Sequence, residues 1–110
     1  MIVRKSLLLL AVPAILLLDL SAALAEWRPQ QRTAFMNDCV AACRENSKVS
    51  PGEKALCGSA CGCVMSEAEK FMTPADFDAA TAAIAQGKSS AMLDRVNALI
   101  PICNRRTFGP

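Results

Sequence analysis

Six cysteines are the residues of this 110-residue chain whose type and spacing are best suited to chemistry. They are Cys39, Cys43, Cys57, Cys61, Cys63 and Cys103. Cysteine sulfur can form structural disulfides, exchange disulfides with other thiols or bind a soft metal ion. The sequence contains no histidine, so serines such as Ser59 and Ser66 lack the usual general base for nucleophilic catalysis. We therefore expect a protein that is not an enzyme.

Four of the cysteines form two C-x-x-x-C pairs that thirteen residues separate. Positions i and i+4 lie on one face of an α-helix, about 6 Å apart along its axis. In an antiparallel helical hairpin, residues at equal height have numbers with a constant sum. The outer cysteines, Cys39 and Cys61, add to 100. The inner cysteines, Cys43 and Cys57, give the same sum, so a single register allows both disulfides.

The remaining two cysteines are expected to form a third disulfide. Cys63 follows Cys61 by two residues, about 200° around the helix, and cannot face the same hairpin partner. It is left to pair with Cys103, which would hold the C-terminal part of the chain against the hairpin. Six cysteines allow fifteen sets of pairs, so the register restricts the choice without proving it. Each bond would stabilise the fold by about 2 to 4 kcal/mol.

Two other uses of the sulfur are alternatives. Cys61-Gly62-Cys63 could form an exchangeable disulfide, although a reactive thiol needs a helix N-terminus or a nearby cation to lower its pKa. The two C-x-x-x-C pairs could bind Zn(II) or Cu(I), with three methionines as further copper ligands: Met36, Met65 and Met72. An oxidising compartment opposes metal binding because the thiols would not stay reduced. We expect no metal and no cofactor.

An acidic stretch consists of Glu67, Glu69, Asp76 and Asp78. Paired-carboxylate catalysis or a calcium site would use such residues, but the stretch has no loop of alternating oxygen ligands. Asp76 also stands where it complements the positive end of a helix that Thr73 begins. We expect a solvated helix face here.

Residues 1–25 have the pattern of a secretory signal peptide. Arg4 and Lys5 precede an apolar run from Ser6 to Leu18, and Ala23-Leu24-Ala25 is a small-x-small cleavage site. An uncleaved membrane anchor is the alternative, because a spanning helix needs roughly 20 apolar residues and the stretch that ends at Ala25 is that long. Cleavage would leave residues 26–110 as one domain without a membrane span, located in the periplasm or secreted, where disulfides form.

The charge balance narrows the class of partner. The chain has 12 basic and 10 acidic residues, and residues 1–25 include Arg4, Lys5 and Asp19, so residues 26–110 have a net charge of +1. A nearly neutral domain gives no reason to expect a nucleic acid partner. We expect another envelope or secreted protein as the partner, and the sequence gives no oligomeric state.

Start and stop signals predict an all-α fold: a disulfide-stapled antiparallel helical hairpin plus two further helices. The four segments run from about Pro29 to Ser47, from Pro51 to the boundary before Thr73, from Pro74 to Gly87, and onward from Ser89 or Ser90. The second segment begins with a capping box, Ser50 to Glu53.

Three residues in or next to these segments have more detailed predictions. Ile84 continues the apolar stripe of the third segment and should point inward. Pro101 should kink or end the fourth segment, with a frayed tail after it. Trp27 either packs at the edge of the core or marks a contact surface, and packing is expected because an aromatic ring buries a large area.

The C-x-x-x-C, thirteen residues, C-x-x-x-C arrangement resembles the helical hairpins of two families: the small Tim chaperones of mitochondria and the plant α-hairpinins. The resemblance covers about residues 35–65 and implies the same outer and inner cysteine pairs. Separately, "FMNDC", "CGCVMSEAEKFMTPADFDA" and one late cysteine resemble a class of small exported proteobacterial proteins, which implies no known activity. The expected function is a non-enzymatic binding role outside the cytoplasm. The alternative is a thiol–disulfide or copper-handling protein that uses Cys61-Gly62-Cys63.

Overall fold

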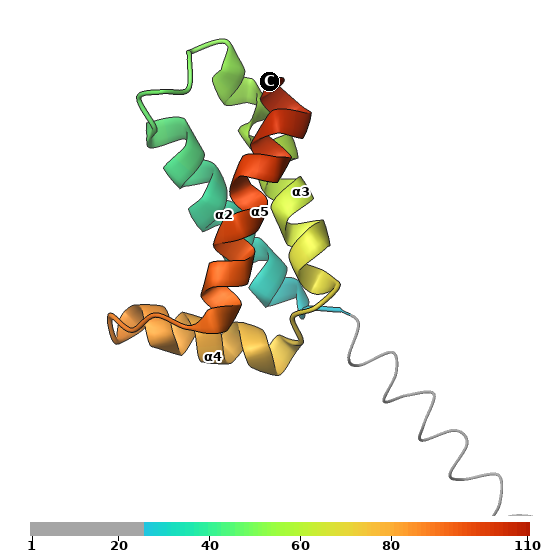
Figure 1. Ribbon diagram of the computed structural model, residues 1–110, viewed down its shortest axis with the longest axis vertical. Coiled ribbons are helices and arrows are strands. Elements are labelled where there is room, and N and C mark those ends of the chain that lie inside the picture. Colours follow the sequence, from blue (N-terminus) through green and yellow to red (C-terminus); the bar gives the residue numbers. More distant parts are fainter. Residues whose placement is uncertain (1–25) are drawn as a thin grey trace, which may run out of the picture.

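A computed structural model describes residues 26–110, which fold into four α-helices and no strand (Figure 1). These are α2 (Pro29–Glu45), α3 (Cys57–Glu69), α4 (Pro74–Ala85) and α5 (Ala91–Phe108), with the 3₁₀-helix η1 (Glu53–Leu56) before α3. The predicted all-α class is confirmed. The predicted signal peptide, residues 1–25, lies outside the described residues. Within residues 26–110, no helix is both long enough and apolar enough to cross a membrane.

Short polar side chains fix where the helices begin. Thr73 Oγ1 accepts a hydrogen bond from the Asp76 N–H at 3.1 Å, and Asp76 Oδ2 accepts one from the Thr73 N–H at 3.0 Å, which forms a capping box for α4. Ser90 Oγ accepts from a backbone N–H in the first turn of α5 at 3.1 Å. The predicted capping box of Ser50 and Glu53 also forms, but it leads first into η1 and then into α3.

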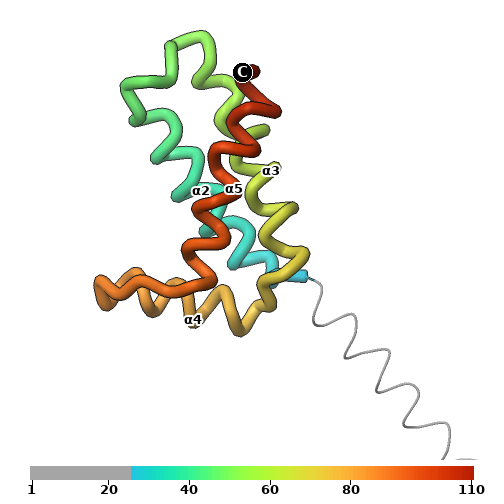
Figure 2. The backbone as a smooth tube through the Cα atoms, in the orientation of Figure 1, coloured from blue at the N-terminus to red at the C-terminus, as the bar shows by residue number. Residues whose placement is uncertain are grey.

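Helix α3 lies between α2 and α5. Both outer helices pack along α3, and neither packs extensively on the other. They run in the same direction and α3 runs in the opposite one, while α4 lies across one end of all three (Figures 1 and 2). This arrangement leaves the faces of α2 and α5 that look toward each other without a helix between them.

Trp27 is the central side chain of the core at the α4 end. Its side chain is buried, and its indole Nε1 donates a hydrogen bond to the Met72 carbonyl at 2.9 Å. Its ring meets Phe35 and Phe77 edge to face, with ring centroids 5.5 and 4.7 Å away. The expected packing role of Trp27 is confirmed, because the ring is inside the domain and the polar N–H is paired.

One buried polar side chain, Gln31, ties the beginning of α2 to α4. Its Oε1 accepts from the Arg28 N–H at 2.9 Å, and its Nε2 donates to the Pro74 carbonyl at 2.9 Å and to Asp78 Oδ1 at 3.0 Å. All of its hydrogen-bonding groups therefore have a partner, and burial of an amide costs little free energy when its hydrogen bonds are made. Nothing in the sequence distinguishes Gln31 from its neighbour Gln30, which is exposed.

Of the two outcomes predicted at Pro101, a kink or an end of the fourth helix, the end is wrong, and so is the frayed tail. Helix α5 continues through Pro101 to Phe108. A proline leaves the carbonyl four residues earlier without its helical donor. That residue, Asn97, is exposed, so water can donate to its carbonyl. Beyond the proline, Cys103 is buried in a disulfide to α3, which holds the last turns in place until Gly109, with a φ of 89°, ends the helix.

Candidate functional site

Three disulfides hold the helices together. They join Cys39 to Cys61, Cys43 to Cys57 and Cys63 to Cys103, with Cα–Cα distances of 5.9, 5.8 and 5.7 Å. The first two are the pairs that the hairpin register predicts, and the third is the predicted pair of the two remaining cysteines. The first two connect α2 to the N-terminal half of α3, and the third connects the opposite side of α3 to α5. Such a set of disulfides is consistent with an oxidising compartment.

The disulfides use the cysteine sulfur atoms that disulfide exchange or metal binding would need. No cysteine within residues 26–110 is free. Cys61 and Cys63 belong to different disulfides, and Cys61 is buried. A four-sulfur metal site would use the same thiolates that form the two hairpin bonds. Across the part of the chain that the structure describes, no three His, Cys, Asp or Glu side chains are grouped to hold a metal ion.

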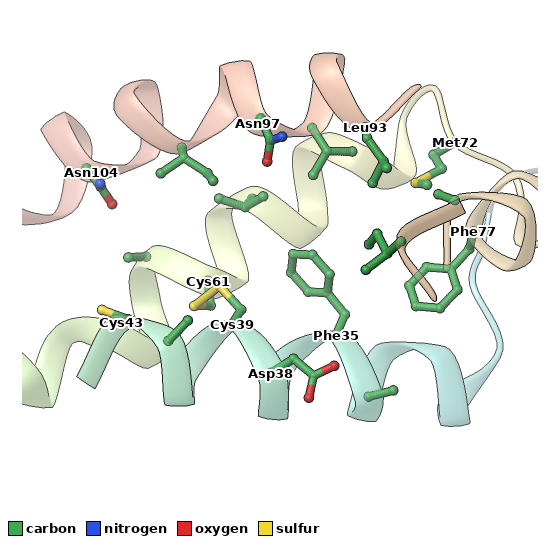
Figure 3. A pocket seen from close by; sticks show the side chains of 18 of the residues that line it. Phe35, Asp38, Cys39, Cys43, Cys61, Met72, Phe77, Leu93, Asn97 and Asn104 are labelled. Atoms are coloured by element: carbon green, nitrogen blue, oxygen red, sulfur yellow. A yellow bond between two sulfur atoms is a disulfide. The ribbon is translucent and has the colours of Figure 1, made fainter. Parts of the chain in front are cut away.

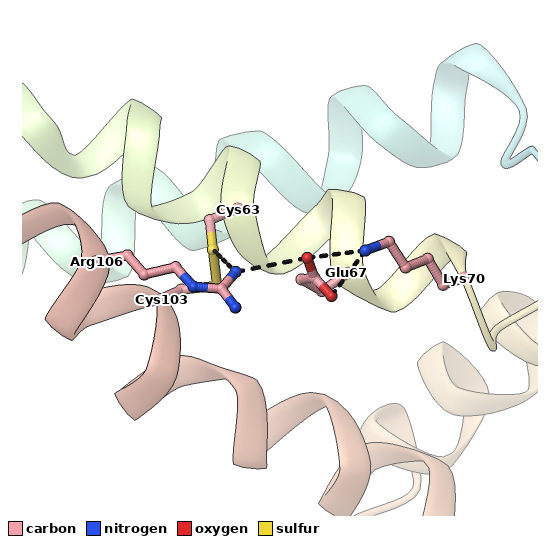
Figure 4. The surroundings of a disulfide bond; sticks show 5 residues. All are labelled: Cys63, Glu67, Lys70, Cys103 and Arg106. Carbon is pink, nitrogen blue, oxygen red and sulfur yellow. Dashed lines mark hydrogen bonds and ion pairs between the residues drawn. A yellow bond between two sulfur atoms is a disulfide. The ribbon is translucent and has the colours of Figure 1, made fainter.

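The outer side of the Cys63–Cys103 bond lies beside a chain of ion pairs (Figure 4). Arg106 Nη1 lies 3.9 Å from the sulfur of Cys63 and 3.5 Å from Glu67 Oε1. Glu67 also accepts from Lys70 Nζ at 3.0 Å. The hydrogen bond and charge of Lys70, with a smaller contribution from Arg106, lower the pKa of Glu67. Arg106 is thus shared between a sulfur atom and a carboxylate.

The other acidic side chains of the predicted acidic face also have individual partners. Arg32 binds Glu69 through two hydrogen bonds of 2.7 and 2.8 Å, and this contact raises the pKa of Arg32. Asp78 accepts from Gln31 and, at 2.6 Å, from Arg28, and these hydrogen bonds lower the pKa of Asp78. The carboxylates therefore link helices to one another and do not converge on a common point.

An open apolar groove of about 710 Å³ lies between α2 and α5 (Figure 3). Its volume falls within the range of about 300 to 1,000 Å³ that is usual for ligand sites. Residues about one turn apart on each helix form the walls: Ala34, Phe35, Cys39, Ala42 and Cys43 on α2, and Leu93, Val96, Ile100 and Phe108 on α5. Ala60, Cys61 and Val64 of α3 form the floor. Three of the hairpin cysteines, Cys39, Cys43 and Cys61, thus have a second role as part of an apolar surface.

The end of the groove nearest α4 is aromatic. Trp27, Phe35 and Phe77 line it, and the Phe35 ring projects from α2 into the space between the two walls (Figure 3). Ile84 of α4 also lines the groove, but its side chain is 63% exposed. The prediction that Ile84 points into the core is therefore wrong. Helix α4 crosses the end of the other helices, so its first turns cover the core while its later turns extend past it (Figure 1).

Polar side chains stand along both edges of the groove. Asp38 lies on α2, and Asn97 and Asn104 lie on α5 (Figure 3). Asn46, the residue that follows α2, lines the same edge as Asp38. Among residues 26–110, Asp38 is the one charged residue that lines the groove, and it makes no ion pair with another described residue. An apolar floor between polar edges can bind an amphipathic ligand, with apolar groups inside and polar groups at the edges.

Several of these residues form apolar stripes that the sequence itself shows. Phe35 on one segment, and Leu93, Val96 and Ile100 on another, recur at helical spacing with other apolar residues, and the periodicity of a stripe shows which face of a helix is apolar. It does not show whether another helix covers that face. Ile100 is 43% exposed because α2 and α5 stay apart on either side of α3.

The described chain is thus a small cysteine-rich helical protein with an apolar groove of ligand-site size. Its three disulfides connect the groove's floor to both walls. Comparison of the chain with protein-family models, with curated proteins and with solved structures gave no match.

Proposed function

We propose that this protein is a non-enzymatic, exported binding protein that holds an apolar helical segment of another envelope or secreted protein in the groove between α2 and α5. The groove is the observation that carries the proposal. Apolar surface of this extent is usually covered in a small domain, and where it is open it commonly marks an interaction site. The cysteine sulfur atoms, which are the other main candidates for chemistry, are all used in disulfides within the described residues.

The shape of the groove supports a helical occupant. Its lining residues on α5 extend from Leu93 to Phe108, which corresponds to about 22 Å of helix. An amphipathic helix of about four turns has this length, and such helices commonly bind by placing an apolar stripe in a groove. Side chains at i, i+3, i+4 and i+7 of the occupant would enter the groove, and its polar flanks would face the edges.

The disulfides support a binding role as well. Two of them fix α2 on α3 and the third fixes α5 on α3, so both walls are covalently attached to the floor. A site that is already in its binding conformation loses less conformational entropy when it binds. We propose that the disulfides serve to hold the groove open as well as to stabilise a domain of modest size.

The location outside the cytoplasm is part of the same proposal. It rests on the signal-peptide pattern of residues 1–25 and on three disulfides, which persist in an oxidising compartment. The periplasm or the extracellular space meets this condition. The twin C-x-x-x-C arrangement, with its resemblance to small Tim chaperones and α-hairpinins, is in keeping with a disulfide-held helical binding protein.

Peptide binding to the oxidised protein, purified from the periplasm of a bacterial host, tests this proposal. The probe is a helical peptide of about four turns with leucines at i, i+3, i+4 and i+7. Trp27 is the chain's only tryptophan and lines the groove, so its fluorescence should change on binding. Ile100→Gln should weaken binding about tenfold, because about 1.4 kcal/mol of apolar burial would be lost.

Ile102→Gln is the matched control. Ile102 is on the same helix with a similar exposed fraction, 37% against 43%, but it does not line the groove. It should bind the peptide as the unmodified protein does. Absence of peptide binding, or an equal loss in both variants, would contradict the proposed function.

A count of free thiols separates this function from the redox or copper alternative. Protein isolated from the oxidising compartment should have no free thiol and no bound copper, since the structure places Cys61 and Cys63 in separate disulfides. Copper bound in the isolated protein, or a pair of cysteines that glutathione readily reduces, would favour the alternative.

A further inference from the structure

We infer that the segment held in the groove is a cationic amphipathic helix, with a lysine or arginine side chain beside Asp38. The inference rests on the proposed function and specifies the chemistry of its partner. It begins from the sign of the charge at the edge of the groove. Asp38 is exposed and makes no ion pair within residues 26–110, whereas Glu67, Glu69 and Asp78 each pair with a cation.

No positively charged residue among residues 26–110 lines the groove. Several basic residues of α2 and α5 are already engaged elsewhere. Arg32 and Arg106 bind carboxylates, and the guanidinium of Arg95 lies 3.9 Å from the centre of the Phe71 ring. An anionic ligand would therefore find one carboxylate and no cation in the groove, while a cationic one would gain a charge pair. Complementary charge of this kind sets the specificity of an interface.

The other polar groups at the edges do not select a charge. Asn46, Asn97 and Asn104 have amide side chains that both donate and accept hydrogen bonds. They can pair with lysine, glutamate or an uncharged polar residue of the occupant. Asp38 alone favours one sign, because an ionised carboxylate only accepts hydrogen bonds.

The position of Asp38 also predicts where the positive charge lies along the bound helix. The groove residues of α2 and the residue that follows it extend from Ala34 to Asn46, about 18 Å along the axis. Asp38 lies one turn from Ala34, on the side of the aromatic end. The basic residue of the bound helix should therefore lie in the two turns that are nearest α4. It should be next to the large apolar side chain of the bound helix that contacts Phe35 and Phe77.

Three peptides with the same leucine stripe test the inference. Their flanking positions carry lysine, glutamine or glutamate, and each is titrated into the oxidised protein while Trp27 fluorescence is recorded. The lysine peptide should bind about three- to fivefold more tightly than the glutamine peptide, as expected for a partly exposed charge pair, and the glutamate peptide should bind most weakly. High salt should reduce these differences.

Asp38→Asn should remove the preference for lysine while leaving the affinity for the glutamine peptide unchanged. Asp94→Asn is the control, because it removes the same charge from an exposed position outside the groove. If Asp94→Asn reduces the preference as much as Asp38→Asn, the attraction comes from net charge and the inference is wrong. Equal binding of all three peptides would overturn the inference and leave the proposed function standing. Binding of none would overturn both.

Discussion

The free-energy cost of removing a disulfide depends on how much chain it closes, and the three bonds differ in this respect. Cys63–Cys103 joins residues 40 positions apart and is the one disulfide in residues 26–110 that reaches α5. Cys43–Cys57 joins residues 14 positions apart and lies inside the loop that Cys39–Cys61 closes. When either hairpin bond is removed, the other still keeps the two helices linked one turn away.

These loop lengths correspond to different contributions of the disulfides to the unfolding free energy. Loop-closure entropy for the 40-residue separation of Cys63–Cys103 corresponds to about 4 kcal/mol. For either hairpin bond, the remaining one leaves an effective loop of only about ten residues, which corresponds to about 2.7 kcal/mol. In each of these two pairs one cysteine is fully buried: Cys103 in the Cys63–Cys103 pair and Cys57 in the Cys43–Cys57 pair. Replacement of either pair by alanine therefore removes one fully buried sulfur, and the packing losses are matched.

Urea unfolding followed by far-UV circular dichroism measures this difference. Under non-reducing conditions, Cys63→Ala/Cys103→Ala should lose about 1 kcal/mol more unfolding free energy than Cys43→Ala/Cys57→Ala. Cys39→Ala/Cys61→Ala should lose about as much as the inner-pair variant, because the two hairpin bonds are nested. The reasoning is refuted if the Cys63–Cys103 variant is the most stable of the three.

Three further predictions concern single side chains and pH. Gln31→Leu should lower the unfolding free energy by about 1 to 3 kcal/mol, since leucine cannot replace the hydrogen bonds that the buried amide makes to the Arg28 N–H, the Pro74 carbonyl and Asp78. Gln30→Leu, at an exposed position, should change it by less than about 0.5 kcal/mol in the same urea titration. Pro101→Ala should raise the melting temperature, because it restores a helical N–H donor worth about 1 to 3 kcal/mol; an unchanged or lower value would contradict the description of α5. The pKa values of Asp78 and Glu67 are lowered in the folded state. Their contribution to the unfolding free energy is therefore complete above about pH 5 and is lost as the pH falls through the folded-state pKa values. Urea midpoints that stay constant from about pH 6 to pH 3 would contradict these contacts.

The parts of the fold that depend on local geometry could be predicted from the sequence. The pairing of Cys39 with Cys61 needs only the regular rise of a helix and an antiparallel turn. The caps at Thr73 and Ser90 are likewise interactions between residues three positions apart. In each case the residues that decide the outcome are close in sequence or related by a simple register.

The remaining features depend on contacts between distant residues. Helix α5 continues past Pro101 because a disulfide holds its later turns, and Ile84 is exposed because α4 crosses the end of the bundle. Burial of Gln31 depends on the position of the Pro74 carbonyl on another helix. The groove was not predicted for the same reason: the stripes of α2 and α5 are visible in the sequence, but the distance between two helices that pack on opposite sides of a third is not.

Nuclear magnetic resonance with ¹⁵N-labelled, fully oxidised protein provides the decisive measurement. On addition of the lysine-flanked leucine peptide, chemical shifts should change at Asp38, Asn97 and Ile100 and at the indole N–H of Trp27, while Ser66 and other residues away from the groove stay unchanged. Shift changes on the outer faces of the helices with none along the groove, or no change at saturating peptide, would show that the groove is not a binding site.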